Sequence, residues 1–237
     1  MKNWAVCFLS VTTLAASQLS YGEYLAEGTK AAFTLPSNVT MMATAALSVL
    51  VLGSYDDEFR RYSQERGIMS DALSHQLDLY GGRWVYPALM GMSWLTPGSR
   101  DEKRERLQFS LSAIGVTATT TWLMKRLSGR ERPNGNDRKS FPSGHTSGSF
   151  TVAAIMGELY GENAGMVAYL VAAMVGAHRI HDDKHWLTDV IAGAALGTAV
   201  GKGFSQVYRE AGEESGVSLI PERNKQSIMI TLVIPIN

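Results

Sequence analysis

Long, mostly apolar segments rich in alanine, leucine and glycine restrict this chain to helical folds. The main segments are Val39–Gly53, Leu107–Met124, Thr146–Tyr160, Ala164–His178 and His185–Phe204. Each is long enough for a helix of about four turns. The alternation of apolar and polar residues that is typical of strands is almost absent before Ser227. The sequence therefore predicts an all-α fold, a bundle of about six helices, with a short C-terminal β or extended tail at Ser227–Ile234.

The first residues have the features of a secretory signal. Lys2 precedes the apolar run Trp4–Ala16, and Ala15, Ala16 and Ser17 are small enough for cleavage. We therefore predict a signal peptide over residues 1–17 and a single helical domain over residues 18–237, in an exported protein of a bacterial envelope. An uncleaved anchor or a buried first helix is the alternative. Cys7, the only cysteine, lies in this run, so the mature chain would form no disulfide.

The apolar segments also bear on whether the chain meets a membrane. They run for about 15 to 18 residues, the lower edge for spanning a bilayer, and the mean hydropathy of −0.04 is low for a membrane protein. Val39–Gly53 and Ala164–Val175 are nevertheless continuous enough to face lipid. We expect membrane association, with a soluble periplasmic bundle as the alternative. The formal net charge is zero, so no nucleic-acid partner is expected.

Three polar clusters lie between residues 125 and 189, each beside an apolar segment. The first holds Lys125 and Arg132, the second is Pro142-Ser143-Gly144-His145, and the third holds Arg179, His185 and Asp189. The first follows one helix, the second precedes the next, and two further helices return the chain to the same end of the bundle. Cations, imidazoles and a carboxylate would then meet there. This combination predicts a site that binds a phosphate and transfers it to a histidine.

The third cluster supplies the reactive pair. His185 and Asp189 are four residues apart at the start of a helix and share one face. The carboxylate can fix the tautomer of the imidazole and leave its other nitrogen as a base or nucleophile. The guanidinium of Arg179 suits two phosphate oxygens at once. A pair of this kind in isolation would usually be a weak surface contact, so its meaning depends on the other clusters.

The first two clusters are less specific on their own. Gly144 allows a tight turn and close approach to a ligand, Ser143 can cap the following helix, and His145 could protonate a leaving oxygen. An ordinary capped turn with a surface histidine would look the same. Lys125 and Arg132 could likewise belong to a solvated basic patch with Arg126 and Arg130.

Together the three clusters resemble the signature of the type-2 phosphatidic acid phosphatase superfamily. This superfamily includes lipid phosphate phosphatases, bacterial class A acid phosphatases and vanadium haloperoxidases. The resemblance covers residues 125–189 and is specific in its spacing. It implies that Lys125, Arg132 and Arg179 hold the phosphoryl oxygens, with hydrogen bonds from Ser143 and Gly144. It also implies that His185, oriented by Asp189, forms a phosphohistidine, that His145 protonates the leaving group, and that no metal or other cofactor is needed.

The resemblance has one departure, and it leaves the substrate open. His178 stands where the family usually has serine before the third-cluster arginine. The apolar helices favour a lipid phosphate such as phosphatidate, phosphatidylglycerol phosphate, undecaprenyl pyrophosphate or lipid A, with a soluble phosphomonoester as the alternative. The active site would face the periplasm. Because one histidine must be neutral and the other protonated, a bell-shaped pH–rate profile with changes between about pH 5 and 8 is expected.

Three other functions remain as alternatives. One is a metal hydrolase, because several potential ligands crowd together: His178, His181, Asp182, Asp183 and His185. That hypothesis leaves the basic residues unexplained. A non-enzymatic envelope scaffold and a vanadate-dependent oxidase are the others.

Overall fold

The computed structural model describes residues 7–15, 19–214, 218–223 and 228–236. The chain divides into two compact units, one made of residues 25–206 and the other of residues 1–24 and 207–237. The helices are α1 (Tyr21–Thr34), α2 (Pro36–Leu52), α3 (Asp56–Arg66), α4 (Asp71–Leu79), α5 (Val85–Leu95), α6 (Arg100–Ser128), α7 (Gly144–Tyr160), α8 (Glu162–His181) and α9 (Leu187–Glu214). Two short turns complete the set, the 3₁₀ turn η1 (Gly53–Tyr55) and the π-helical turn η2 (Tyr80–Trp84). The predicted all-α class is confirmed.

The structure contains more helices than the predicted six, because polar segments also become helical. Residues 56–66, most of which are charged or polar, form α3. The first turn of α3 carries Asp56, Asp57 and Glu58 and its last turn carries Arg66, which suits the helix dipole. Helix α4 begins where the hydroxyl of Ser70 accepts a hydrogen bond from the Leu73 amide. Neither helix has a long apolar segment, so hydrophobic pattern alone did not predict them.

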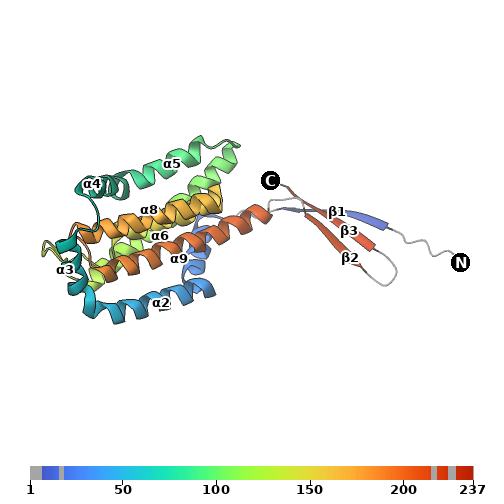
Figure 1. The fold of residues 1–237 in the computed structure, drawn as a ribbon. Helices are drawn as coiled ribbons and strands as arrows, with labels where there is room; N and C mark the ends of the chain where they lie inside the picture. Colours follow the sequence, from blue (N-terminus) through green and yellow to red (C-terminus); the bar gives the residue numbers. More distant parts are fainter. Residues whose placement is uncertain (1–6, 16–18, 215–217, 224–227, 237) are drawn as a thin grey trace. The chain divides into compact units, whose positions relative to one another are not determined.

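Helix α7 lies at the centre of the helical unit and packs against α5, α6 and α8. In Figure 1, α6, α8 and α9 lie between α5 and α2. Buried hydroxyls join α6 to α7, with Thr117 and Thr151 2.8 Å apart and Thr121 and Ser147 2.9 Å apart. On α9, a Cβ added to Gly197 would lie 2.1 Å from the carbonyl oxygen of Ser147. Small residues thus let α9 approach α7 closely, as expected for segments rich in Thr, Ser and Gly.

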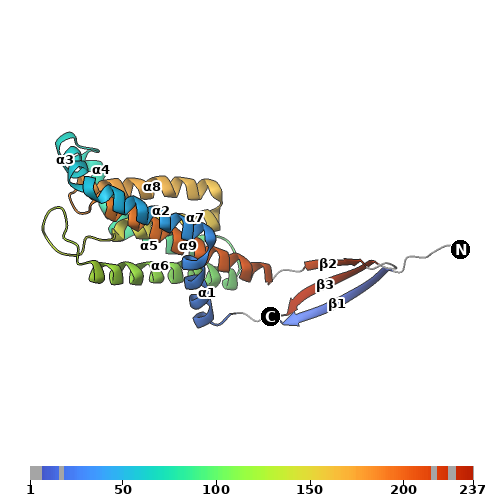
Figure 2. The ribbon, with the colours of Figure 1, turned by 90° about the horizontal axis from the view of Figure 1, so that it is seen from below.

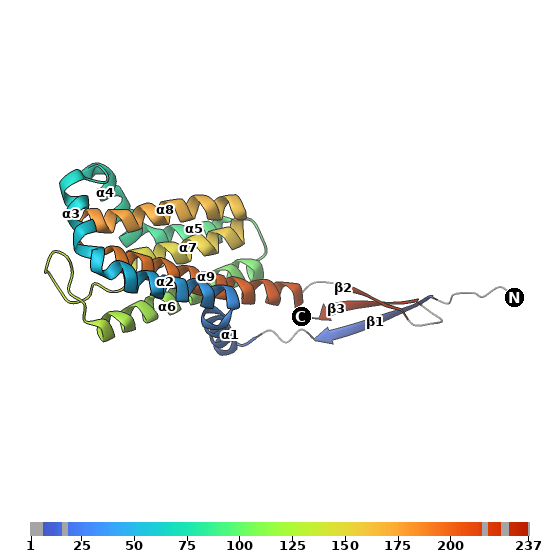
Figure 3. The same cartoon turned by 60° about the horizontal axis from the view of Figure 1, so that its bottom comes forward.

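The ends of several helices gather at one end of the helical unit. The loop between α6 and α7, the turn between α8 and α9, and helices α3 and α4 all lie there (Figures 1 and 3). Figure 2 shows the same loop extending beyond the end of α6. The three polar clusters of the sequence lie on these segments, so the predicted convergence has a structural basis.

The second unit contains a three-stranded sheet. Its strands are β1 (Cys7–Ala15), β2 (Ser218–Arg223) and β3 (Ile228–Ile236), in the order β1-β3-β2. Strand β3 pairs in parallel with β1 and antiparallel with β2. It covers most of the predicted tail and continues past Pro235, whereas Ser227 lies outside the described residues. Ala16 and Ser17, two of the three small residues predicted for cleavage, also lie outside them, so the signal peptide stays a prediction.

A large part of the helical surface is apolar. On α2, Leu47, Leu50 and Val51 are 64%, 77% and 64% exposed. Met166, Val167 and Leu170 on α8 are also exposed. Among the described residues, one continuous helical stretch, Pro36–Arg66, is long and apolar enough to cross a membrane, by length and composition, and little of it is buried.

Candidate active site

The imidazole of His185 is buried beside the carboxylate of Asp189. Its Nδ1 lies 3.4 Å from Oδ2 of Asp189, and the two side chains are 2% and 0% exposed. His185 lies in the turn before α9, where its backbone amide donates to the carbonyl of Arg179. The predicted pair therefore exists as a buried contact and not as a surface one. With Nδ1 directed at the carboxylate, Nε2 is the nitrogen left for chemistry.

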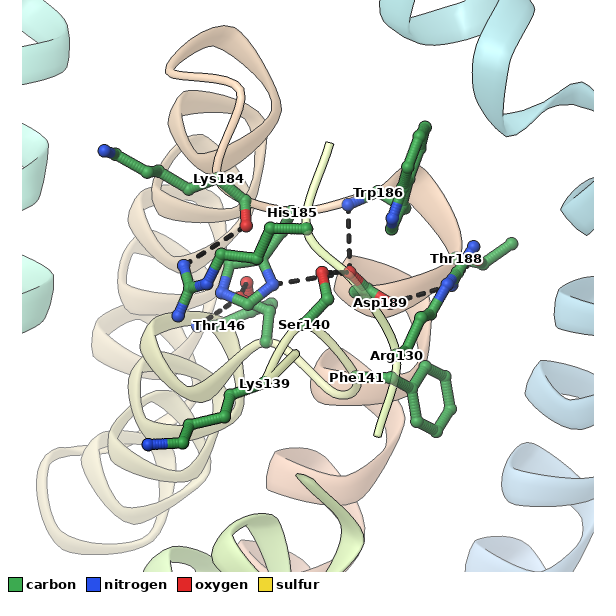
Figure 4. A network of polar contacts seen from close by, with 12 residues as sticks. Arg130, Lys139, Ser140, Phe141, Thr146, Lys184, His185, Trp186, Thr188 and Asp189 are labelled. Atoms are coloured by element: carbon green, nitrogen blue, oxygen red, sulfur yellow. Dashed lines mark hydrogen bonds and ion pairs between the residues drawn. The ribbon is translucent and has the colours of Figure 1, made fainter. Parts of the chain in front are cut away.

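Several groups hold the Asp189 carboxylate in place (Figure 4). Oδ2 accepts hydrogen bonds from the hydroxyl of Ser140 at 2.5 Å and the amide of Trp186 at 2.9 Å. Oδ1 accepts from the guanidinium of Arg130 at 2.8 Å. Burial alone raises the pKa of Asp189, but the hydrogen bonds from His185 and Ser140 and the charge of Arg130 outweigh it and leave that pKa below its ordinary value. Asp189 is thus a fixed anion.

Arg130 links this carboxylate to a second buried one. Its other terminal nitrogen donates to Oδ2 of Asp56 at 2.6 Å, and Asp56 also accepts from the amide and the hydroxyl of Thr188. Arg130, Asp56, Ser140 and Thr188 were not predicted as site residues. Arg130 looked like part of a basic patch, and Asp56 lies far outside the motif region, so nothing local marked either of them.

The three predicted cations lie close enough to affect one another. Burial, followed by the charge of Arg132, lowers the pKa of Lys125 to about 8, and the charge of Arg179 acts in the same direction. Lys125 donates to the carbonyl of Lys139 at 2.6 Å. Arg132 is held by Asp137 at 2.8 Å and by the carbonyl of Lys184 at 3.2 Å. Loop and turn atoms therefore hold Lys125 and Arg132 in place.

The second predicted cluster begins α7. The hydroxyl of Ser143 caps the helix by accepting from the Thr146 amide, as expected, and the Ser143 amide donates to the carbonyl of Asp189 at 3.0 Å. Gly144 differs from the expectation of a tight turn. It is the first helical residue, and an added Cβ would make only ordinary contacts, 3.6 Å from Thr121 and 3.8 Å from Lys125. A side chain there would stand beside the Lys125 amine.

His145 faces a group that the sequence did not indicate. Its Nε2 lies 3.5 Å from Oδ1 of Asp78, a residue of α4, and the same oxygen accepts from Arg179 at 2.6 Å. Burial and the charge of Arg179 lower the pKa of His145 to about 3, although Asp78 opposes the shift. Burial likewise lowers the pKa of His185 to about 4, against the effect of Asp189. Both imidazoles are therefore neutral at pH 7 in the phosphate-free site.

The residues of the proposed metal centre are engaged elsewhere. Asp183 accepts two hydrogen bonds from Arg60, each 2.6 Å long. His178 is paired through Nδ1 with the hydroxyl of Ser74 at 3.0 Å. Across the part of the chain that the structure describes, no three His, Cys, Asp or Glu side chains form a group that could hold a metal ion. The clustering of these residues in sequence does not become a cluster of ligands in space.

Comparisons with known proteins agree with this site. Residues 106–213 match the model of the PAP2 superfamily. Among curated proteins, the Lipid A 1-phosphatase of Porphyromonas gingivalis is 40% identical over 77 residues, which make up 31% of this chain. The match spans only 17% of that relative's length.

Two solved structures share the fold. Aquifex aeolicus LpxE has a TM-score of 0.51 at 21% identity, over 61% of this chain and 91% of that one. The first transmembrane PAP2 type phosphatidylglycerolphosphate phosphatase from Bacillus subtilis has a TM-score of 0.59 at 17% identity, over 78% of this chain and 98% of that one. At these identities the likeness is one of fold. The segment 106–213, which matches the PAP2 superfamily, contains all three polar clusters.

Proposed function

We propose that this protein is a phosphatase that removes phosphate from a membrane lipid through a phosphohistidine at His185. The observation that carries the proposal is the buried His185–Asp189 pair, with Asp189 held by Arg130 and Ser140. A neutral imidazole oriented in this way is a nucleophile. The charges of Lys125 and Arg179 both lower the pKa of His185. The two cations are therefore near enough to bind the oxygens of a phosphoryl group attached to this imidazole.

The reaction divides into two balanced steps. In the first, Nε2 of His185 attacks phosphorus, the bond from phosphorus to the lipid oxygen breaks, and His145 gives a proton to that oxygen. In the second, water attacks phosphorus, the bond from phosphorus to Nε2 of His185 breaks, His145 takes a proton from the water, and inorganic phosphate leaves. Lys125, Arg132 and Arg179 stabilise the charge on the phosphoryl oxygens throughout.

His145 must carry a proton when the first step begins. Its pKa of about 3 in the phosphate-free site would leave it neutral. An incoming phosphoryl dianion places negative charge beside the imidazole and therefore raises its pKa. Substrate binding thus supplies part of the condition for acid catalysis.

An apolar groove supports a lipid as the substrate. A cavity of about 400 Å³ is lined by α2, α6 and α9, with Phe33 and Phe141 at its sides. Its lining residues Met124 and Phe141 are the chain neighbours of Lys125 and Ser140, so the groove lies next to the phosphate site. Pockets of this size and character hold apolar ligands. An acyl chain could lie in the groove while the phosphate group of the same lipid is bound by the cations.

The relatives and the surface support a membrane location. The name of the Porphyromonas gingivalis relative assigns it a phosphorylated glycolipid, lipid A, and the Bacillus subtilis protein is described as transmembrane. One candidate membrane helix, Pro36–Arg66, fits the same setting. These observations support a membrane location, and we propose in addition that the site faces the periplasm. Lipid A is the first substrate to test.

The experiment is a phosphate-release assay on the purified full chain. The panel contains lipid A, phosphatidate, phosphatidylglycerol phosphate, undecaprenyl pyrophosphate and a soluble phosphomonoester, with His185→Ala as the control. Release from at least one lipid, absent in the variant, is expected. Activity on the soluble ester alone would favour a soluble acid phosphatase, and release unchanged by the substitution would contradict the mechanism.

A further inference from the structure

Resting on the proposed phosphatase function, we infer that Asp78 is a positioning residue that favours the protonated, proton-donating form of His145 and fixes Arg179 beside it. Helix α4 and the turn η2 would then belong to the active site, although they lie outside the segment 106–213 that matches the family.

One carboxylate oxygen of Asp78 gathers three groups. Oδ1 accepts a hydrogen bond from Arg179 at 2.6 Å and lies 3.5 Å from Nε2 of His145. It is also 3.6 Å from Nε2 of His178. The carboxylate therefore faces the group proposed to donate a proton and one of the cations proposed to hold phosphate. An anion beside an imidazole favours its protonated form.

The turn after Asp78 brings the backbone against the ring of His145. A Cβ added to Gly82 would lie 2.8 Å from Nε2 of His145. At Gly81 the added atom would be 2.8 Å from Val175 and 3.4 Å from His145. Only glycine leaves room for this approach, and π-helical turns often occur at functional sites. The two glycines thus allow the turn η2, which follows Asp78, to pack directly against the imidazole of His145.

His178 does not form an ion pair with Asp78, so the negative charge of Asp78 acts on His145 and Arg179. Arg179 donates to Nε2 of His178 at 3.3 Å, so that nitrogen is unprotonated. Nδ1 then carries the hydrogen and donates to Ser74, which donates to Asp182 at 2.5 Å. Burial, followed by the charge of Arg179, lowers the pKa of His178. His178 is therefore neutral and helps to hold Arg179 in place.

The surroundings of His145 otherwise oppose its protonation. Arg179 and His178 on α8 and His185 before α9 all lower its pKa, in addition to burial. Asp78 on α4 acts in the opposite direction. A phosphoryl group bound to Arg179 would also raise the pKa of His145, but Asp78 lies beside the imidazole before the substrate binds. Loss of the Asp78 charge should lower the pKa of His145, so that less of it carries the proton for the leaving group. It should leave the nucleophile His185 unchanged.

The test compares two esters with the full-length Asp78→Asn protein. A long-chain alkyl phosphate needs a proton on its leaving oxygen, whereas p-nitrophenyl phosphate needs little help. We expect kcat to fall about 100-fold on the alkyl ester and less than about 10-fold on the nitrophenyl ester. The alkaline limb of the pH profile should move to lower pH, and the acidic limb should stay. Asp78→Glu should recover part of the loss.

The matched control is Asp71→Asn, which removes a charge from a fully exposed residue of the same helix. It should behave like the wild type. Equal losses of Asp78→Asn on both esters, with an unmoved alkaline limb, would show a merely structural role and overturn the inference. Higher activity and tighter orthovanadate binding by Asp78→Asn would also overturn it, because Asp78 would then be a competitor for Arg179.

A measurement that needs no turnover separates the inference from the proposed function. The imidazole of His145 can be titrated by nitrogen NMR with orthovanadate bound, in the wild type and in Asp78→Asn. A lower His145 pKa in the variant supports the inference even if the natural substrate is not a lipid. An unchanged pKa overturns it, while a wild type that releases no phosphate from any ester counts against the proposed function alone.

Discussion

At the scale of single residues, the orientation of His185 depends on groups that do not touch the substrate. Arg130 ties Asp189 to Asp56 and so joins the start of α9 to the start of α3. The motif residues could be predicted from sequence because their spacing is local. Arg130, Asp56 and Asp78 could not, since their roles depend on which helix ends meet in space. His178 was noticed only as a departure, and its bond to Ser74 required the fold.

Replacing Arg130 tests how far this support matters. Arg130→Met should lower kcat about 100-fold with little change in KM, because Asp189 would lose its cationic partner and the imidazole its fixed orientation. Steady-state kinetics on the best ester of the panel measure the effect. Arg126→Met, an exposed arginine over Trp122 in the same segment, is the control. Equal kinetics in both variants would contradict a positioning role for Arg130.

The pH dependence follows from the lowered pKa of His185. The imidazole is the nucleophile when neutral, so kcat/KM should rise with pH through about 4 and not through 6.5. The acidic limb of the pH profile then lies below the range of pH 5 to 8 expected from sequence. The reason is that burial lowers the pKa of His185 by more than Asp189 raises it. A limb centred near 6.5 in the wild type would contradict the buried, neutral state.

The same shift affects stability. Between the folded pKa of about 4 and the ordinary value of 6.5 the unfolded chain binds more protons at His185, so the free energy of unfolding rises with pH in this window. The contribution is complete above pH 6.5 and is lost as the pH falls toward 4. Thermal melts at pH 7 and 4.5 should show a smaller difference in His185→Gln than in the wild type. An equal difference would mean that His185 titrates normally.

At the scale of elements, the apolar segments predicted the long helices correctly, although the helices begin and end at other residues than the segments do. Helix α6 begins at Arg100, ahead of the apolar segment Leu107–Met124, because Ser99 and Glu102 form a capping box. Pro87 is the third residue of α5, which continues directly from the π-helical turn η2, and the helix runs on through it to Leu95. The walls of the apolar groove could not be located from sequence, because they come from helices far apart along the chain.

A bulky side chain in the groove tests its use by an acyl chain. Ala46 lines the groove, whereas Ala43, on the same helix, is exposed and does not. Ala46→Trp should raise KM for a long-chain phosphate about 10-fold, from the loss of one or two kcal/mol of apolar contact. It should leave p-nitrophenyl phosphate unaffected. Ala43→Trp should change neither, and the same KM for both variants on the long-chain substrate would contradict the groove.

At the scale of the whole molecule, the exposed apolar surface bears on location. The zero net charge and the mean hydropathy of −0.04 did not predict it, because composition does not say which apolar side chains face outward. Leu47 and Leu50 lie in the candidate membrane helix. The double substitution Leu47→Lys and Leu50→Lys should weaken retention in membranes during a carbonate wash, since lysine is costly in lipid.

The control for that experiment is Gln76→Lys, on an exposed position of α4. It adds a charge outside the apolar surface and should fractionate like the wild type. A wild-type chain recovered entirely in the soluble fraction would contradict the membrane location but would leave the phosphatase site untouched.

The most direct test of the account is capture of the phosphorylated intermediate. The full-length protein is mixed with its best phosphate-labelled substrate, quenched in alkali within one turnover, digested and analysed by mass spectrometry. We predict phosphate on His185 in the wild type and its absence in His185→Asn, which should also be inactive. Phosphate on another residue, or full activity of His185→Asn without any labelled histidine, would contradict it.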